Sequence, residues 1–367
     1  MAVQVIVHHI DYNNLYIKQI EIRSIHMRYI GGKSLLLDYI DEVIKENIGE
    51  VSSIIDVFAG STVVSDHFKK KGIRVISNDF LYFSYVIAKG TLGINKKPSF
   101  GKLGIRNPIK YLNELTIEDT DIELDECFIY KNYSPNGDCE RMYFQNNNAI
   151  KIDIIRKTIE DWKDAELIDT NGYYYLLASL LNAVPYVANI TGVYSAYLKF
   201  WDTRTYNQLE LLKPDILSNS RKNQCYNCDY REIVQKKCDL MYADPPYNSR
   251  EYLPNYHILE TIAKYDNPDI YGVTGMRKYD DQKSDFCKKD TVYKAFEYLI
   301  KNCKSKYLLI SYNNEGLMDT SSLVELCEKY AKNNSFRLYE YDYRRYKNKI
   351  PNEEEGLKEQ LYFLRRH

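Results

Sequence analysis

The sequence lacks the features that would place it in a membrane or in a secretory pathway. No run of about eighteen apolar residues occurs in its 367 residues, so no membrane-spanning helix is expected. The first residues, MAVQVIVHHIDYNN, have neither a basic stretch nor a small-residue cleavage site, which argues against a signal peptide. We therefore expect a soluble, cytoplasmic protein without a membrane partner.

The sequence also lacks a pattern of cysteines that would indicate disulfides or a metal. Eight cysteines in a chain of this length do not form a disulfide framework, which fits a reducing compartment. Only Cys225 and Cys228 have CxxC spacing, and Cys238 follows alone. Because a zinc site usually needs a second pair of ligands, and no nearby histidine is available, we expect no metal.

Charge and length leave the function open. The formal net charge is −1, so any binding of nucleic acid must depend on local basic patches. The chain is long enough for one large domain or for two domains with a substantial core.

The most informative stretch is Asp244-Pro245-Pro246-Tyr247. The apolar run from Cys238 to Ala243 precedes it and predicts a buried parallel strand, which the two prolines end. An acid, two rigid residues and an aromatic ring are therefore expected at the carboxyl edge of a sheet, where open α/β folds bind ligands.

The chemistry that needs this set of residues is methylation of a planar exocyclic amine, whose lone pair is delocalised into the ring. The Asp244 carboxylate and the main-chain carbonyl of Pro245 can accept the two N–H bonds of such an amine. Tyr247 can stack on the base. The alternative interpretation is an N-capping aspartate followed by a Pro-Pro turn.

Two earlier segments predict a ligand site at the same edge. The apolar run from Ile54 leads through Phe58-Ala59-Gly60-Ser61 into a helix, as in the first βα turn of a Rossmann-like unit. Ile73 to Ser77 predicts a second strand, after which Asp79 can hold the two hydroxyls of a ribose. An isolated FxG is also a common structural turn, and Asp79 can equally cap the helix predicted over Tyr82 to Lys89.

The stretch MRYIGGKSLLL contains a second glycine turn. Gly31-Gly32, followed by Lys33 and Ser34, predicts a close backbone approach to a ligand and then an amphipathic helix. It is not a P-loop, because the preceding strand and the GxxxxGK spacing are missing.

The region from about Gly93 to Arg221 interrupts this pattern. A βαβ unit takes about 30 residues, but this longer stretch predicts helices over Ala149 to Trp162 and Tyr173 to Leu181, and no recognisable strand. We expect an inserted, mainly helical domain. Candidate phosphate contacts within it, all of which could equally be solvated charges, are Lys96, Lys97, Arg106, Lys199 and Arg204.

The rest of the chain returns to alternating strands and helices. CYNCDYREI predicts a short strand followed by Asp229 and a helix, and Tyr307 to Asn313 predicts another buried strand. FRLYEYDYRRY and EQLYFLRR predict a final antiparallel pair with a basic tip over 344–349. Further helices are predicted over Tyr256 to Lys264, Val292 to Cys303 and Ser322 to Ala331.

Taken in order, RYIGGK, DVFAG, NDF, the long insert, NCDYREI, ADPPYN and LLISYN resemble the Dam-like N6-adenine DNA methyltransferases with the α order of motifs. The likeness runs from about Arg28 to the C-terminus and is weakest in the insert, where NITGVYSAYLK resembles the DNA-contacting hairpin region of the family. It implies a Rossmann-like S-adenosylmethionine-dependent methyltransferase sheet, α/β, mostly parallel with an antiparallel final strand. The catalytic domain would comprise residues 27–94 and 222–367, and the inserted helical target-recognition domain residues 95–221.

The resemblance also implies residue roles, with S-adenosylmethionine as cofactor. Tyr29 stands where the family often has Trp. The cofactor-binding residues would be Tyr29, Gly31, Lys33, Phe58, Gly60, Asp79 (ribose), Asp229 (adenine of the cofactor) and Asp244. The catalytic residues would be Asp244, Pro245, Pro246 and Tyr247, and the DNA contacts Tyr194, Lys199, Arg204, Arg344, Arg345 and Lys347.

The expected function is site-specific methylation of N6 of adenine in double-stranded DNA, as part of a restriction-modification system, with a cognate restriction endonuclease as a candidate partner. Since a base inside a duplex cannot reach Asp244, it must be flipped out of the stack. The alternatives are methylation of an RNA base or of cytosine N4, methylation of protein glutamine, and a catalytically dead methyltransferase that only binds DNA.

Residues 1–26 lie outside the likeness. Their few apolar residues can bury little surface, and ordering a residue costs about 1–2 kcal/mol of backbone entropy. We expect a peripheral extension that forms no part of the active site. The alternative is a short edge strand over Val3 to Val7.

Overall fold

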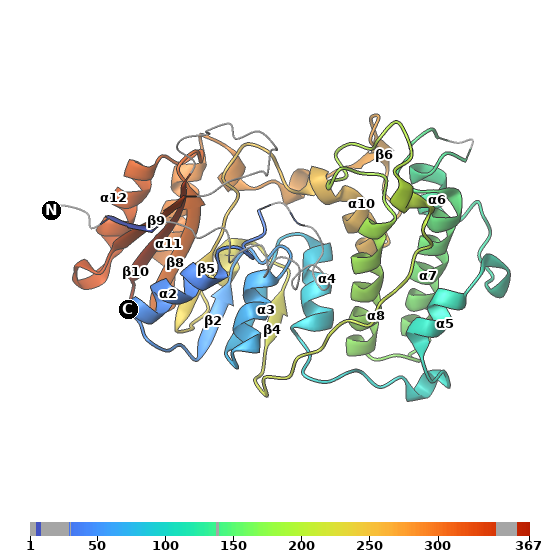
Figure 1. Ribbon diagram of the computed structural model, residues 1–367, viewed down its shortest axis with the longest axis horizontal. Helices are drawn as coiled ribbons and strands as arrows, with labels where there is room; N and C mark the ends of the chain where they lie inside the picture. Colours follow the sequence, from blue (N-terminus) through green and yellow to red (C-terminus); the bar gives the residue numbers. More distant parts are fainter. Residues whose placement is uncertain (1–4, 9–28, 30, 137–138, 343–357) are drawn as a thin grey trace.

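The centre of the molecule is one mixed β-sheet (Figure 1). The computed structural model describes residues 5–8, 29, 31–136, 139–342 and 358–367. In this part of the chain, eight strands pair in the order β1-β9-β10-β8-β5-β2-β3-β4. All run in one direction except β10, which is antiparallel to β8 and to β9, so the mostly parallel sheet with an antiparallel final strand is confirmed. The strands are β1 (Val5–His8), β2 (Ser53–Asp56), β3 (Arg74–Asn78), β4 (Gln224–Tyr226), β5 (Leu240–Ala243), β8 (Tyr307–Asn313), β9 (Arg337–Asp342) and β10 (Lys358–Arg365).

Helices cover both faces of the sheet, and the alternation of side chains along each strand shows why. On β5, Leu240 and Tyr242 pack against α2 and α3, whereas Met241 and Ala243 pack on the opposite face against α9, α11 and α12. This period of two, with all four residues buried, explains the continuous apolar run before the prolines. These helices are α2 (Leu37–Asn47), α3 (Val63–Lys70), α9 (Tyr230–Ile233), α11 (Val292–Asn302) and α12 (Thr320–Tyr330).

The region between β3 and β4 is mainly helical, as expected, and lies on the right in Figure 1. The predicted run Ala149 to Trp162 falls within α7, and Tyr173 to Leu181 falls within α8. The helices there and beside it are α4 (Tyr82–Thr91), α5 (Pro108–Glu114), α6 (Phe128–Tyr133), α7 (Asn146–Asp164), α8 (Thr170–Ala183) and α10 (Leu253–Lys264), and a small hairpin of β6 (Ile270–Tyr271) and β7 (Met276–Arg277) follows α10.

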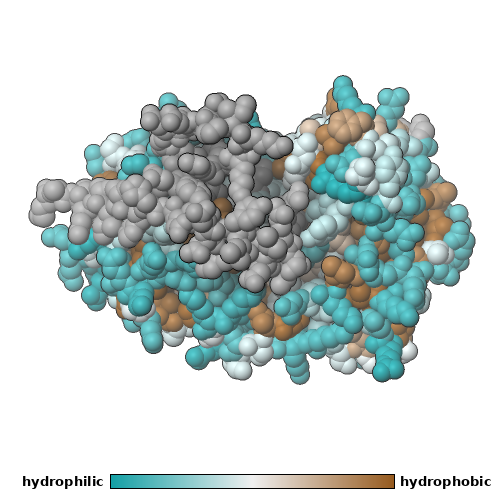
Figure 2. Space-filling view, viewed as in Figure 1, coloured by the Kyte–Doolittle hydropathy of each residue, from teal (hydrophilic) through white to brown (hydrophobic). Residues whose placement is uncertain are grey.

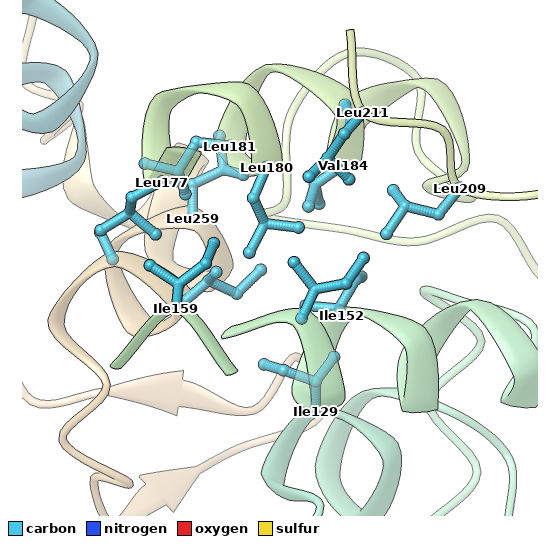
Figure 3. Packing of buried hydrophobic residues seen from close by; sticks show 14 of the residues in the cluster. Ile129, Ile152, Ile159, Leu177, Leu180, Leu181, Val184, Leu209, Leu211 and Leu259 are labelled. Atoms are coloured by element: carbon cyan, nitrogen blue, oxygen red, sulfur yellow. The ribbon is translucent and has the colours of Figure 1, made fainter. Parts of the chain in front are cut away.

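The helices of the region between β3 and β4 that follow α4, namely α5 to α8, share one hydrophobic cluster with α4 and α10. Helices α4 and α10 belong to the flanking parts of the chain. Figure 3 shows its centre, where Ile152 of α7, Leu180 of α8 and Leu259 of α10 lie close together. Helix α8 approaches α4 closely because Gly90 has no side chain: a Cβ there would overlap the carbonyl oxygen of Tyr174. The helical region is therefore fixed firmly against the sheet-bearing part.

Four residues of the N-terminal segment belong to the sheet. Val5–His8 forms β1, which pairs in parallel with β9 at the edge of the sheet, with Val5 opposite Leu338. Strand β1 overlaps the edge-strand alternative, Val3 to Val7, at residues 5–7. Because β1 lies at the edge of the sheet, a peripheral extension that forms no part of the active site stays a prediction. The predicted basic tip over 344–349 lies outside the described residues.

No helix in the described ranges is long and apolar enough to cross a membrane. In the view of Figure 2 the described surface is mostly hydrophilic, with hydrophobic residues in scattered groups.

Candidate active site

The carboxyl ends of four parallel strands, β2, β3, β4 and β5, open into one cavity. Its empty volume is about 1040 Å³, including the open mouth. The lining brings together nine of the predicted residues, from segments far apart in the sequence: Tyr29, Gly31, Lys33, Phe58, Gly60, Asp79, Asp229, Asp244 and Pro246.

The turn after β2 shapes the floor of the cavity. Gly60 has a φ of 50°, in the left-handed region that favours glycine. A Cβ at this position would lie 2.7 Å from Cε1 of Tyr29, so the tyrosine ring lies directly on the glycine. The ring of Tyr29 also stacks on Tyr256 of α10, with centroids 4.7 Å apart and planes 3° apart. Gly60 is therefore required for the shape of this part of the cavity.

Asp79 links the ends of two strands. Its Oδ2 accepts a hydrogen bond from the backbone N–H of Gly60 at 2.7 Å, and its Oδ1 accepts one from Leu81 at 2.8 Å. Burial raises the pKa of Asp79 to about 6, although these N–H groups oppose the rise. The helix-capping alternative for Asp79 holds only in part, because the N–H groups of Tyr82 and Phe83 in α4 donate to the buried Glu260.

Asp244 belongs to a group of three charged side chains. Nζ of the buried Lys33 lies 3.2 Å from Oδ1 of Asp244 and 2.5 Å from Oε1 of Glu359 on β10. Burial alone would lower the pKa of Lys33, but the two carboxylates raise it well above its ordinary value. Burial raises the pKa of Asp244 to about 7; Lys33 opposes this shift and Glu359 adds to it. Asp244 can therefore exchange a proton near neutral pH.

Another carboxyl group lines the cavity at the end of β2. Asp56 is buried, and its Oδ2 accepts a hydrogen bond from Oγ of Ser65 at 2.7 Å. Among the described residues, its Oδ1 has no hydrogen-bond partner. Burial raises its pKa to about 7, and the charges of Asp244 and Asp79 contribute to the rise.

Of the three residues that follow Asp244 in the proline motif, only Pro246 lines the cavity. Pro245 is buried beneath it. Tyr247 is half-buried against the hydrophobic cluster below α11 and α12, and its carbonyl accepts a hydrogen bond from the N–H of Leu317 at 2.9 Å. Its ring is not part of the lining, so stacking of Tyr247 on a base stays a prediction.

Asp229 lies at the mouth of the cavity as the N-cap of α9. Its Oδ1 accepts a hydrogen bond from the N–H of Arg231 at 2.8 Å, and its Oδ2 lies 3.0 Å from the Arg231 guanidinium. The same guanidinium pairs with Asp285 across the mouth. Asp229 lines the cavity, and its contact with a cofactor stays a prediction.

The residues predicted to contact DNA differ in how exposed their side chains are. Tyr194 is 1% exposed and its backbone carbonyl accepts a hydrogen bond from the hydroxyl of Tyr143, so this ring belongs to the core and cannot reach DNA. Arg204 is half-buried, and its guanidinium donates to the carbonyl of Ile190. Lys199 is exposed beside Phe200, which is 67% exposed. Arg344, Arg345 and Lys347 lie outside the described residues.

Three residues of the site were not anticipated. Glu251 and Tyr252 line the cavity a few residues after the proline motif, and the hydroxyl of Tyr252 would be 3.3 Å from a Cβ at Gly31. Their closeness in sequence to Asp244 was the available signal. Glu359 had no such signal, because only the pairing of β10 brings it to this edge. No group of three or more His, Cys, Asp or Glu residues within the described ranges could hold a metal ion.

Comparison with known proteins gives a consistent set of relatives. The sequence model of the D12 class N6 adenine-specific DNA methyltransferases matches residues 29–326. The chain is 42% identical over 346 residues to the Type II methyltransferase M.FokI of Planomicrobium okeanokoites, which is 93% of this chain and 53% of that protein. It is 41% identical over 345 residues to the modification methylase StsI of Streptococcus sanguinis, covering 93% of this chain and 52% of that protein.

A further relative has a length close to that of this chain. The Type II methyltransferase M.NlaIII of Neisseria lactamica is 36% identical over 325 residues, which is 88% of this chain and 92% of that protein. The chain therefore spans about half the length of M.FokI and StsI, and most of the length of M.NlaIII.

Proposed function

This chain belongs to the D12 class of N6 adenine-specific DNA methyltransferases, and from that membership we propose that it methylates N6 of an adenine flipped out of duplex DNA, with S-adenosylmethionine as the donor. The observation that carries the proposal is the shared cavity of Asp244, Asp79 and the Gly60 turn. The acid expected at the target amine and the groups expected at the cofactor open into the same space.

The residues present fit S-adenosylmethionine. Gly60 lets the ring of Tyr29 lie directly on the turn after β2, and Tyr29, Phe58 and Gly60 together line the cavity. Each oxygen of Asp79 accepts one backbone N–H, which leaves lone pairs for two ribose hydroxyls. Asp229 at the mouth would contact the adenine of the cofactor. When bound, the cofactor supplies an electrophilic methyl group.

Asp244 and the Pro245 carbonyl would act on the target amine. Both are hydrogen-bond acceptors and would hold its two N–H groups, which concentrates the lone pair on nitrogen. Because its pKa is raised to about 7, the Asp244 carboxylate can also accept the proton that the amine loses. Lys33 fixes Oδ1 of Asp244 and leaves Oδ2 for the amine.

The helical region would read the DNA. We assign target recognition to residues 95–221, since the cavity lies at the sheet edge beside this region and duplex recognition needs a separate surface. The exposed side chains of Lys96, Lys97, Arg106 and Lys199 would contact phosphates. The Type II names of the relatives favour a role in restriction-modification beside a cognate restriction endonuclease.

Transfer of a tritiated methyl group tests this proposal. The purified chain is incubated with labelled S-adenosylmethionine and with duplex DNA, RNA or protein. Two variants at opposite ends of β5 are compared: Asp244→Asn, and Asp239→Asn as the matched control, whose carboxylate bonds to Ser52 and Ser53 away from the cavity. We expect the parent and Asp239→Asn to label duplex DNA, and Asp244→Asn to lose this labelling. Labelling confined to RNA or protein, or full activity of Asp244→Asn, would contradict the proposal.

A further inference from the structure

Glu359 reaches the active-site edge because β10 runs against the other strands. The parallel strands present their carboxyl ends at this edge, whereas β10 presents its amino end, with Glu359 opposite Asn313 at the end of β8. Its side chain is buried, and its Oε1 accepts hydrogen bonds from Lys33 Nζ at 2.5 Å and from Ser311 Oγ at 3.0 Å. Glu359 does not line the cavity but lies behind Lys33.

This arrangement gives the buried group a net negative charge. Lys33 carries one positive charge, and the two carboxylates of Asp244 and Glu359 carry two negative charges when ionised. Nζ of Lys33 lies closer to Glu359 than to Asp244, 2.5 Å against 3.2 Å. Since Glu359 engages Lys33 from behind, the charge of Asp244 at the cavity surface is only partly compensated.

The other carboxylates at the cavity are compensated locally. Asp79 accepts two backbone N–H groups, Arg231 pairs with both Asp229 and Asp285, and Glu251 accepts the backbone N–H of Ser284. Asp56 accepts a hydrogen bond from Oγ of Ser65. The group of Lys33, Asp244 and Glu359 is therefore placed to attract a cation into the cavity.

We propose that Glu359 makes the cavity prefer the cationic sulfonium of the methyl donor over the neutral thioether that remains after transfer. The inference rests on the proposed function, because it assumes that this cavity binds the donor. Without the charge of Glu359, Lys33 and Asp244 form a neutral pair, and a cation gains little from the site. With the charge of Glu359, the neutral product binds less tightly than the cationic donor, which favours replacement of the product by a new donor molecule.

Titration calorimetry with S-adenosylmethionine and with S-adenosylhomocysteine tests this preference directly, without any DNA. The two ligands differ by the methyl group and the charge on sulfur, so a general loss of folding would weaken both alike. The Glu359→Gln variant removes the charge and keeps the shape. The matched control is Glu340→Gln on the neighbouring β9, whose carboxylate bonds to Lys358 and Gln360 outside the cavity lining.

We expect Glu359→Gln to reduce the affinity ratio of the donor to the product by about tenfold, the scale of one partly screened charge. Glu340→Gln should keep the ratio of the parent. The Glu359→Asp variant keeps the charge on a shorter side chain, so its ratio should stay near that of the parent. This variant also tests the proposal if Glu359→Gln alone does not fold.

The outcomes separate this inference from the proposed function. An unchanged ratio in Glu359→Gln, or a ratio about tenfold below the parent in a folded Glu359→Asp variant, overturns the role of Glu359 alone. If the parent binds neither ligand, both the proposed function and this inference are wrong.

Discussion

Replacing Gly60 with alanine should disable the cavity through a single steric contact. The backbone φ of 50° is strained for any residue with a Cβ, and the new methyl group would lie 2.7 Å from Cε1 and 3.1 Å from Cζ of Tyr29. The ring cannot yield freely, because its stack on Tyr256 holds it from the other side. The ring or the turn must therefore move, and both form the cavity wall.

Gly72→Ala is the control for Gly60→Ala, because it has the same backbone strain without the steric contact. Its φ of 78° is also left-handed, but a Cβ there would meet no atom within 4 Å. Each substitution should cost about 1–2 kcal/mol for the backbone conformation. Only Gly60→Ala should pay a further cost of about 1–3 kcal/mol for overpacking against Tyr29.

Denaturant unfolding and titration with S-adenosylmethionine measure the two consequences. We expect Gly60→Ala to lose more stability than Gly72→Ala and to lose cofactor binding, which Gly72→Ala should retain. Adding Tyr29→Leu to Gly60→Ala should recover part of the lost stability. Equal losses in both single variants, with unchanged cofactor affinity, would refute the assignment of this wall.

Three further predictions concern single elements of the account. Asp79→Ala should weaken binding of S-adenosylmethionine by about 1.5–3 kcal/mol, and an affinity equal to that of the parent would remove Asp79 from the ribose. The pKa of Asp56 is raised from 3.8 to about 7, so the folded state favours its protonated form, and the stability it contributes is present at low pH and lost as pH rises through 7. The melting temperature of Asp56→Asn relative to the parent should therefore increase between about pH 5 and about pH 8, and a constant difference would contradict the shift. A chain that starts at Met27 should melt at a lower temperature, because β9 loses β1 and keeps only β10 as a neighbour. It should bind the cofactor normally, since β9, β10 and β8 separate β1 from β5, and a loss of binding would contradict this.

Much of the sheet and its site could be predicted because short apolar strands leave clear local signals. The run before Asp244 is buried on both faces and ends at prolines, and each acid that follows a parallel strand must lie at the same edge. This rule places Asp79 and Asp244 at the same edge of the sheet. The family resemblance added the order of the motifs and so the identity of the ligand.

Glu359 could not be predicted because its position depends on long-range pairing. It lies 326 residues from Lys33, in a segment without a motif, and only the antiparallel register of β10 brings the two side chains together. The prediction that Tyr194 contacts DNA was wrong for a related reason. Interleaved basic and aromatic residues indicate a surface on average, but they do not show which ring turns inward.

The four residues of β1 show the limit of an argument from apolar burial. So short a segment buries little side-chain surface, which suggested an extension outside the fold. The edge of β9 offers backbone hydrogen-bonding groups along its whole length, and pairing from Val5 to His8 satisfies them. Backbone pairing was the contribution that the burial argument omitted.

The central claim is that the cavity methylates N6 of adenine in duplex DNA. Duplex DNA containing many different sequences is incubated with the full chain and S-adenosylmethionine, digested to nucleosides and examined by mass spectrometry. The account predicts N6-methyl-2′-deoxyadenosine with the parent and its absence with Asp244→Asn. N4-methyl-2′-deoxycytidine as the product, or no modified nucleoside from a parent protein that binds the cofactor, would contradict the account.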